Sequence, residues 1–404
     1  MRIYFSGISG TGIGPLAELA KDAGEDVMGS DLAPGAISPE LGKRQIEVYY
    51  GEQNGDFLRQ KHSEAAIDWF VYTSALPENH PELLLAQELG IRCSKRDEFL
   101  ANFVRQRQLK MIAVAGTHGK TTTVAMLIWA MQQLGYAVNY AVGTTLGWAP
   151  SAHYAPEAEY FVYEADEYDR NFLAYYPDLA VITSVDYDHP DIYPTAENYQ
   201  AAFRQFESQS KDVVKNTTLD ERITLVGELR RQDGSQVLEV LRRLGADEEA
   251  AIDAINRFPG AGRRFEEICP GVYSDYGHHP AEIRATVAMA AELKQRDSYA
   301  GLAVIYEPHQ NTRQHEVYAE YRNAFMDADK VFWLPTYLTR EKPALEVLPP
   351  KFFIEKLENR TAAEAVATDE AFAQKLHQLR AEGWLIVLMT AGPADGWLRR
   401  VFAS

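Results

Sequence analysis

The sequence predicts an α/β protein of three domains, and three observations support this prediction. The chain has 404 residues, of which 46% are hydrophobic and 24% charged, values typical of two or three globular domains. Short apolar runs alternate with stretches suited to helices, as in the strand–helix units of a parallel sheet. Glycine-rich loops follow the apolar runs that end near Phe5 and Ala115, where a phosphate group can rest on a helix N-terminus.

Net charge and cysteine content limit the classes of partner. The chain has 40 Lys and Arg residues against 58 Asp and Glu residues, a formal net charge of −18. We therefore expect neither a nucleic-acid partner nor attachment to an anionic membrane. Only Cys93 and Cys269 occur, without metal-binding spacing, and no uncharged apolar run approaches the roughly 18 residues of a membrane span. These features predict a cytoplasmic protein with no membrane span, structural zinc site or signal peptide.

The first predicted domain, residues 1–108, has the strand–loop–helix–strand order of a Rossmann-like fold. An apolar strand at Ile3–Phe5 leads through a glycine-rich turn into a helix at Gly14–Ala23 and a second strand at Asp26–Gly29. The remaining elements expected here are two strands and one helix, at Trp69–Thr73, Ile91–Cys93 and Pro81–Leu89.

The glycine-rich turn of this domain suits a diphosphate. It contains Gly7, Gly10, Gly12 and Gly14, with Ser9 where a strict dinucleotide motif has its second glycine. Asp31 ends the next strand, where an acidic residue bonds a ribose hydroxyl in dinucleotide-binding folds. Taken alone, the same glycines are equally typical of tight packing between a strand and a helix.

The second predicted domain, residues 109–259, contains the strongest local signal in the chain. A strand at Met111–Ala115 enters a phosphate-type loop, which is followed by a helix at Val124–Leu134. Small residues let backbone N–H groups approach phosphate oxygens, and a lysine neutralises their charge. The residues expected to bind ATP are Gly116, Thr117, His118, Gly119, Lys120, Thr121 and Thr122. Val114 stands where the general P-loop motif has its first glycine.

Acidic and histidine residues follow two further strands of this domain, Tyr160–Tyr163 and Leu179–Thr183. Glu164 and His189 lie beyond the ends of these strands, at the sheet edge expected to carry the phosphate loop. Glutamate is an ordinary ligand of Mg²⁺ and histidine an unusual one, so spacing alone favours Glu164 more than His189. Among Asp166, Glu167 and Asp169, we expect at least two to form a solvated acidic turn.

The end of the second domain and the third domain, residues 260–404, continue the α/β pattern. After a short strand at Asp212–Lys215, only about ten residues, 217–226, precede the segment Gly227–Asp233 and the helix Gly234–Leu244, which leaves little material for further sheet. A helix is also expected earlier, at Ala196–Phe206. The third domain is expected to contain four strands and the helix Ala281–Leu293, with the strands at Val272–Ser274, Leu302–Tyr306, Lys330–Leu334 and Trp384–Met389.

Two nucleotide-like loops on separate domains suggest one nucleotide-linked substrate, one ATP and a reaction that joins them. The motifs resemble, in order, those of the Mur ligases of peptidoglycan synthesis. The resemblance rests on Ala115-Gly-Thr-His-Gly-Lys-Thr-Thr-Thr, Glu164-Ala-Asp-Glu-x-Asp-x-x-Phe172, Asp188-His189, Gly262-Arg-Arg-Phe265, Asp275-Tyr-Gly-His-His-Pro280 and Pro308-His-x-x-Thr-Arg313. The start, Gly7-Ile-Ser-Gly-Thr-Gly12 with Gly29-Ser-Asp31, resembles the UDP-sugar-binding domain of the same family.

The resemblance implies an ATP-dependent, ADP-forming acid–amino-acid ligase that uses ATP and Mg²⁺. We expect it to join L-alanine to UDP-N-acetylmuramate through an acyl phosphate. One alternative is the recycling reaction, in which the acceptor is the tripeptide L-alanyl-γ-D-glutamyl-diaminopimelate. The others are a nucleotide-binding descendant without catalysis and an unrelated P-loop kinase. Glu164-Ala-Asp-Glu-Tyr-Asp169 leans toward recycling, whereas Tyr276-Gly-His-His279 and the Pro308–Arg313 segment lean toward alanine addition.

Site residues follow from the resemblance, residue by residue. It implies catalytic roles for Lys120, His189, Arg264 and His279, and a metal site of Thr121, Glu164 and His189. Arg263, Arg264 and Asp275 would meet the ATP phosphates and ribose. The substrate-binding residues would be Gly7, Gly10, Gly12, Ser30, Asp31, Ser74, His278, His309 and Arg313. We expect a monomer or weak homodimer whose domains close on hinges to protect the acyl phosphate.

Three departures from the family pattern are visible in the sequence. Where relatives have an asparagine that helps to hold adenine, the segment Gly227–Asp233 has Arg230. The central domain is shortened, and the C-terminal glycine-rich turn is only loosely echoed by Ala391–Gly396.

Overall fold

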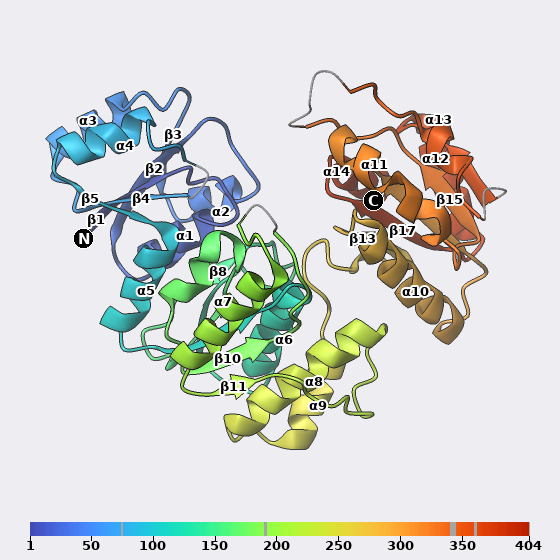
Figure 1. Cartoon of the computed structure of the whole chain (residues 1–404), viewed down its shortest axis with the longest axis horizontal. Coiled ribbons are helices and arrows are strands. Elements are labelled where there is room, and N and C mark those ends of the chain that lie inside the picture. The colour runs from blue at the N-terminus through green and yellow to red at the C-terminus, as the bar shows by residue number, and fades with distance from the viewer. Residues whose placement is uncertain (74–75, 190–191, 340–344, 359–361, 404) are drawn as a thin grey trace. The chain divides into compact units, whose positions relative to one another are not determined.

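A computed structural model describes residues 1–73, 76–189, 192–339, 345–358 and 362–403 (Figure 1). The described residues form three β-sheets flanked by helices, and the chain divides into two compact units. The first unit contains residues 1–223 and 232–258, and the second contains residues 224–231 and 259–404. The predicted α/β class is therefore confirmed. Among the described residues, no helix is both long and apolar enough to span a membrane.

The N-terminal sheet is parallel, with the strand order β3-β2-β1-β4-β5. Because the order reverses beside β1, the loop after β1 lies at the switch point where ligands bind in doubly wound sheets. Its strands are β1 (Arg2–Ser6), β2 (Asp26–Asp31), β3 (Glu47–Tyr50), β4 (Trp69–Tyr72) and β5 (Arg92–Lys95). Its helices are α1 (Gly14–Asp22), α2 (Ser38–Lys43), α3 (Asp56–Glu64), α4 (Pro81–Glu88) and α5 (Arg96–Gln106).

The central sheet has the order β11-β10-β6-β9-β7-β8 and is parallel except for the β7–β8 pair. The strands are β6 (Lys110–Ala115), β7 (Val138–Ala141), β8 (Ala152–His153), β9 (Tyr160–Glu164), β10 (Leu179–Ile182) and β11 (Val213–Val214). The helices are α6 (Lys120–Gln133), the 3₁₀ segment η1 (Tyr168–Ala174), α7 (Ala196–Gln209), α8 (Glu228–Arg243) and α9 (Glu248–Asn256). Strand β6 thus lies between β9 and β10, so the segments that follow these three strands meet at one sheet edge.

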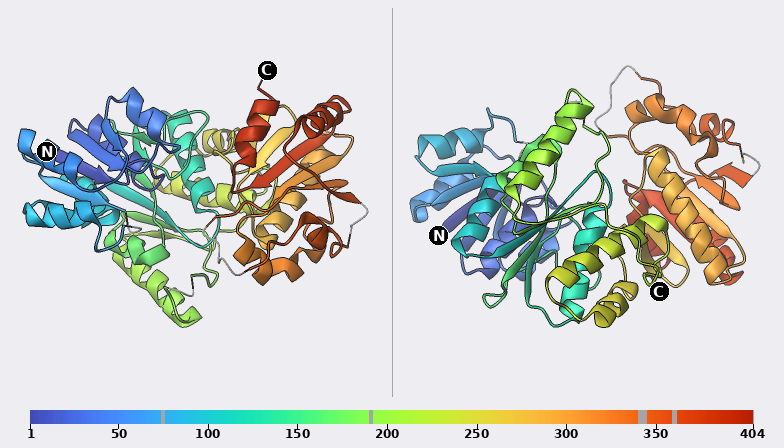
Figure 2. Two further views of the ribbon diagram at one scale, coloured as in Figure 1. Left: turned by 90° about the horizontal axis from the view of Figure 1, so that it is seen from above. Right: turned by 60° about the horizontal axis from the view of Figure 1, so that its bottom comes forward.

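Alternation along β6 explains why helices cover both faces of this sheet. Met111, Ala113 and Ala115 join the core cluster that contains Phe203 and Phe206 of α7, while the intervening Ile112 and Val114 face the opposite side. Helices α6 and α7 lie on opposite faces of the sheet (Figure 2). The same cluster continues into the N-terminal sheet and α1, which explains why the first two sheets belong to one compact unit.

The predicted elements occur with shifted ends. Helix α6 begins at Lys120 rather than Val124, because Gly119 takes the left-handed conformation (φ 83°) at the N-cap and the threonines form the first turn. Helix α8 begins at Glu228 rather than Gly234. Residues 215–265, all of which the structure describes, contain α8 and α9 and no strand. Trp129 of α6 donates a hydrogen bond to the carbonyl of Ala254 in α9 (2.9 Å), so the helical pair is anchored to the central domain.

The third sheet has the order β12-β13-β17-β14-β15-β16, with only the β12–β13 pair antiparallel. The strands are β12 (Glu266–Cys269), β13 (Val272–Asp275), β14 (Leu302–Glu307), β15 (Lys330–Trp333), β16 (Ala363–Ala365) and β17 (Leu385–Thr390). The helical segments are α10 (Pro280–Arg296), α11 (Asn311–Val317), η2 (Tyr318–Asn323), α12 (Pro350–Ile354), α13 (Glu370–Ala381) and α14 (Ala394–Val401). The division after Phe258 lies one residue before the predicted boundary, and the grouping of residues 224–231 with this unit was not predicted.

Candidate functional site

The loop after β6 has a backbone that only glycine tolerates at two positions. Gly116 and Gly119 have positive φ angles of 145° and 83°. A Cβ on Gly116 would collide with the side chain of Thr183, and one on Gly119 would lie 2.6 Å from the buried carboxylate of Asp233. The loop is therefore held closely between the segment after β10 and helix α8, with backbone N–H groups at the start of α6.

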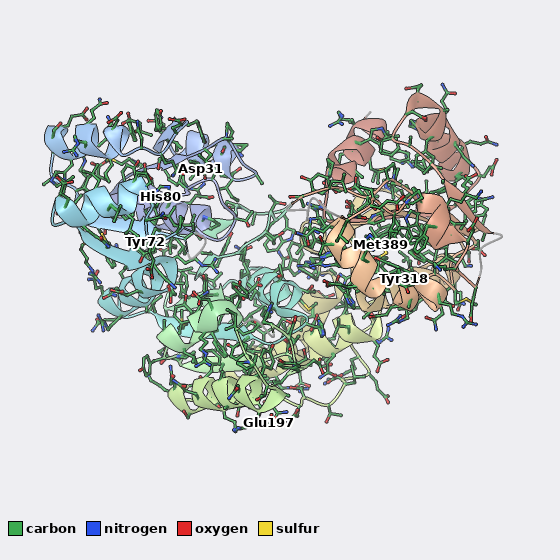
Figure 3. All side chains as sticks on the ribbon, turned by 45° about the horizontal axis from the view of Figure 1, so that its top comes forward. Asp31, Tyr72, His80, Glu197, Tyr318 and Met389 are labelled. Atoms are coloured by element: carbon green, nitrogen blue, oxygen red, sulfur yellow. The ribbon has the colours of Figure 1, made fainter. Side chains whose placement is uncertain are left out.

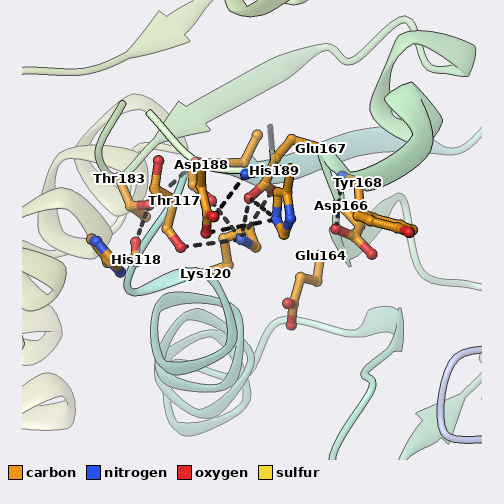
Figure 4. A network of polar contacts seen from close by, with 12 residues as sticks. Thr117, His118, Lys120, Glu164, Asp166, Glu167, Tyr168, Thr183, Asp188 and His189 are labelled. Carbon is orange, nitrogen blue, oxygen red and sulfur yellow. Dashed lines mark hydrogen bonds and ion pairs between the residues drawn. The ribbon is translucent and has the colours of Figure 1, made fainter. Parts of the chain in front are cut away.

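Lys120 is the first residue of α6, and its side chain extends back into this loop (Figure 4). Its Nζ donates hydrogen bonds to the Gly116 carbonyl (2.5 Å) and to Glu167 (3.0 Å), and Glu167 is 1% exposed. The buried ion pair keeps the ammonium group inside the loop.

Glu167 also faces His189, whose Nε2 lies 3.7 Å from its Oε1. Burial would raise the pKa of Glu167, but the contacts with His189 and Lys120 outweigh burial and lower it. In turn, the contact with Glu167 raises the pKa of His189. His189 adopts a positive φ angle of 56°, which is uncommon for a non-glycine residue.

Thr121 and Glu164 are brought together as the sequence predicted. The hydroxyl of Thr121, in the first turn of α6, donates to the Glu164 carboxylate at the end of β9 (2.9 Å). Two adjacent oxygen donors beside a phosphate loop fit Mg²⁺, which keeps several waters and takes few protein ligands. His189 contacts Glu167 instead of this pair, and within the described ranges no three His, Cys, Asp or Glu side chains form a metal-binding group.

The three carboxylates of the acidic turn after Glu164 each contact a cation. Asp166 bonds Arg96 (3.3 Å), Asp169 bonds Lys95 (2.8 Å), and Glu167 pairs with Lys120. Glu167 is buried and so does not belong to a solvated turn, whereas Asp166 and Asp169 are partly exposed and pair with cations of the N-terminal domain that the local sequence does not reveal.

Hydrogen bonds donated by backbone N–H groups hold the N-terminal glycine loop in shape. The N–H groups of Gly7 and Ile8 donate to the carbonyl of Ser30 (2.8 and 3.1 Å), and Gly7 has a φ angle of 81°. Asp31, at the end of β2 (Figure 3), accepts the Ser9 N–H (2.8 Å) and so fixes the loop. Gly10 closes a turn onto Gly7 (3.1 Å).

Not every predicted substrate residue of this domain reaches the loop. The Ser30 side chain is fully buried and donates to Glu82 (2.7 Å), so only the Ser30 backbone shapes the loop. Gly14 serves close packing, because a Cβ there would lie 2.7 Å from Ile37. Ser74 lies outside the described residues.

A cavity of about 190 Å³ reaches from the N-terminal glycine loop to Glu164 at the end of β9. Its wall contains Gly12 and Thr11 from the N-terminal glycine loop and Glu164 from the candidate metal pair. Arg96 and Tyr163 also line the cavity. A ligand here would touch the glycine loop and the candidate metal pair at once.

The second unit holds the remaining predicted residues around Tyr276. The guanidinium groups of Arg263 and Arg264 lie over the Tyr276 ring, at 4.9 and 5.1 Å from its centroid. The His278 ring contacts that of Tyr276 edge-on (5.6 Å) and that of His309 (5.4 Å). Burial lowers the pKa of His278, and the nearby charge of Arg313 on α11 adds to this effect.

Two predicted residues of this unit use their polar atoms on the backbone. Asp275 is buried and accepts the N–H groups of Phe265 and Gly277 (both 2.8 Å), and burial raises the pKa of its carboxyl. His279 is the N-cap of α10 and forms a capping box with Glu282. The structure therefore shows scaffolding contacts for Asp275 and His279.

Sequence reasoning missed Arg96, Lys95 and the importance of Glu167. The Glu167–Lys120 pair joins residues 47 positions apart, and the Arg96–Asp166 pair joins residues 70 positions apart. No local motif marks either pair, although a lysine that needs a buried counter-ion is a general signal for one.

Comparisons with known proteins agree with this architecture. Residues 2–108 match the Mur ligase family catalytic domain, and residues 114–251 match the Mur ligase middle domain. UDP-N-acetylmuramate–L-alanine ligase of Fusobacterium nucleatum is 31% identical, with 84% of each chain covered. The enzyme of the same name from Roseiflexus sp. is 30% identical over 98% of this chain and 97% of its own.

Solved structures show the same fold. The crystal structure of UDP-N-acetylmuramate–alanine ligase from Thermotoga maritima has a TM-score of 0.81 at 21% identity and covers 100% of this chain and 98% of its own. A murein peptide ligase from Psychrobacter arcticus has a TM-score of 0.59 at 20% identity, covering 100% and 98%. From the two domain matches and the full-length relatives, we conclude that this chain belongs to the Mur ligase family.

Proposed function

We propose that this protein is an ATP-dependent, ADP-forming ligase that joins L-alanine to UDP-N-acetylmuramate. One observation carries the proposal: the cavity reaches from the N-terminal glycine loop to Glu164, the partner of Thr121 in the phosphate-loop helix. A sugar nucleotide held by the first loop would extend its carboxylate toward the second. The relatives that match nearly the whole chain, named for this reaction, support the choice of substrates.

In the first step, a carboxylate oxygen of the muramate attacks the γ-phosphorus of ATP, the bond to the β–γ bridging oxygen breaks, and ADP leaves. Lys120 neutralises charge on the transferred phosphoryl group, and the N–H groups at the start of α6 bind phosphate oxygens. Glu167 holds the Lys120 ammonium in place. Thr121 and Glu164 would hold Mg²⁺, which supplies further positive charge to the phosphates.

In the second step, the neutral amine of the amino acid attacks the carbonyl carbon of the acyl phosphate. The carbon–oxygen bond to phosphate breaks, and inorganic phosphate leaves with the proton that the amine nitrogen loses. We propose that Arg263 and Arg264 meet ATP phosphates, and that His278, His309 and Arg313 contact the amino acid. We propose no partners beyond these small molecules and expect a monomer or weak homodimer.

The test is phosphate release by the purified protein with ATP, Mg²⁺ and UDP-N-acetylmuramate, with L-alanine, L-serine, glycine and the tripeptide compared as acceptors. We expect release with L-alanine and a loss of at least about 10²-fold for Lys120→Ala. Lys110→Ala is the matched control, because Lys110 lies at the other end of β6 and pairs with the exposed Glu159. Release with the tripeptide alone would reassign the protein to recycling, and sugar-nucleotide binding without release would show a non-catalytic descendant.

A further inference from the structure

Arg96 occupies a central place that none of the motifs describes. It is the first residue of α5, the helix that leads from the N-terminal sheet to β6, and its side chain is 18% exposed. Nη1 donates to the carbonyl of Gly12 in the N-terminal glycine loop (3.1 Å), and Nη2 donates to Asp166 in the acidic turn (3.3 Å). One planar guanidinium group thus links the N-terminal glycine loop to the acidic turn after Glu164.

The sequence of the glycine loop is adapted to this side chain. Gly12 does not have a positive φ angle, so its backbone does not require glycine. A Cβ at position 12 would instead collide with Nη1 of Arg96. Position 12 is therefore a glycine because the Arg96 side chain passes beside it. A shift of the loop at Gly12 would displace the guanidinium group.

The far side of the bridge is the acidic turn after Glu164, which has backbone hydrogen bonds of its own, from Arg170 to Glu167 (3.1 Å) and from Phe172 to Asp166 (3.0 Å). Asp169 and Arg170 have consecutive positive φ angles of 53° and 58°, a strained conformation for non-glycine residues. Lys95 donates to Asp169 (2.8 Å), next to the Arg96–Asp166 bond. The N-terminal domain therefore adds two side-chain contacts that brace this turn.

The braced turn contains Glu167, the residue that holds Lys120 in the phosphate loop. A continuous chain of contacts thus runs from Gly12 through Arg96 and Asp166 to Glu167 and Lys120. Arg96 also lines the cavity that contains Glu164. Coupling between two sites requires such a connection to an element with two arrangements, and the strained turn is the candidate element.

We propose that Arg96 is a positioning residue that couples sugar-nucleotide binding at the N-terminal glycine loop to ATP binding at the phosphate loop. This inference rests on the proposed function for the identity of the two ligands. A ligand that fixes Gly12 fixes Arg96, which sets the turn of Asp166 and Glu167 and thereby the position of Lys120. The two ligands therefore bind more tightly together than apart.

The test is calorimetric binding of a non-hydrolysable ATP analogue with Mg²⁺, in the absence and presence of UDP-N-acetylmuramate. For the unaltered protein we expect the sugar nucleotide to tighten binding of the analogue about tenfold. In Arg96→Met this ratio falls below about twofold. In Arg96→Lys it stays low, because an ammonium group lacks the fork that spans Gly12 and Asp166. Arg105→Met, on the exposed face of the same helix, keeps the full ratio.

A second variant guards against failure of Arg96→Met to fold. Asp166→Ala removes the other end of the bridge at a half-exposed side chain, and it should lower the ratio as Arg96→Met does. The double variant should show no further loss, because both changes break one connection. An unchanged ratio in either folded single variant, or no tightening in the unaltered protein, overturns the inference. Absence of amide product in the unaltered protein would refute the proposed function without altering this binding ratio.

Discussion

The polar residues around Lys120 in the first unit and those around Tyr276 in the second make different kinds of contact. Around Lys120, side chains contact side chains: Thr121 donates to Glu164, and Glu167 contacts both Lys120 and His189. Around Tyr276, Asp275 and His279 bond backbone N–H groups and hold a turn in shape. Residues of the family motifs therefore divide into those whose side chains meet one another beside the phosphate loop and those that hold a backbone turn.

The largest expected effect concerns Glu164, which belongs to the group of side chains around Lys120. Replacing Glu164 by Gln removes a charged oxygen ligand beside Thr121, so we expect turnover to fall by about 10²–10³-fold and the Mg²⁺ requirement to rise. Glu159→Gln, one residue before β9, is the control, because Glu159 pairs with Lys110 at the opposite end of the strand. Steady-state rates over a Mg²⁺ titration provide the measurement, and near-normal turnover in Glu164→Gln would remove this residue from the metal site.

A second prediction concerns Asp275, which we expect to stabilise more than it binds. Its carboxylate accepts two backbone N–H groups and the hydroxyl of Thr286 (3.2 Å) in a buried position. Asp275→Ala should destabilise the second unit by about 2 kcal/mol, because these donors lose their acceptor. Thermal unfolding and the KM for ATP should be measured together. Lost ATP affinity with an unchanged unfolding temperature would show instead that Asp275 contacts the nucleotide.

The third prediction sharpens the comparison at His279. If His279 serves as a helix cap, His279→Ala should cost about 1 kcal/mol of stability, and His279→Asn, which restores a capping oxygen, should recover most of it with near-normal turnover. If His279 acts in catalysis, Asn cannot replace its imidazole and turnover stays low while stability returns. Unfolding temperature and turnover of the two variants decide between these roles.

These contrasts also show how much the sequence could predict. The strands and the phosphate loop were predictable because apolar runs, glycines and a lysine lie close together in the chain, and β6 and β14 occur where such runs predict them. The start of α6 was placed too late because the threonines after Lys120 have low helix propensity, whereas the left-handed Gly119 starts the helix before them.

Long-range pairs were beyond reach. Lys95 and Arg96 could be read only as surface cations at a helix start, since their partners Asp169 and Asp166 lie 74 and 70 positions away. Asp275 shows the converse: the motif identified the residue, but only the fold shows that Phe265 and Gly277 use its oxygens. Sequence patterns indicate which residues matter, and the register of the fold determines whether they face a ligand or the backbone.

The smallest expected effect concerns Glu18, a second buried carboxylate of the first unit, which forms an ion pair with Arg44 (2.8 Å) and accepts the hydroxyl of Ser151 (2.9 Å). Burial raises the pKa of Glu18 to about 7 even though Arg44 opposes this, whereas the pKa of Glu167 is lowered. A carboxyl group whose pKa is raised in the folded state binds protons more tightly there than in the unfolded chain. Its contribution to stability is therefore full below the unfolded value, about 4.5, and is lost as the pH rises toward about 7.

We therefore expect Glu18→Gln to unfold at a temperature that depends less on pH between 5 and 7.5 than that of the unaltered protein, with turnover nearly unchanged. In contrast, Glu167→Gln should lower turnover across the same pH range, because the Lys120 ammonium loses its buried counter-ion. If Glu18→Gln keeps the full pH dependence, another group titrates in this range and Glu18 is held ionised by Arg44. Two buried carboxylates of one unit would then be equivalent in charge and would differ only in which cation each one positions.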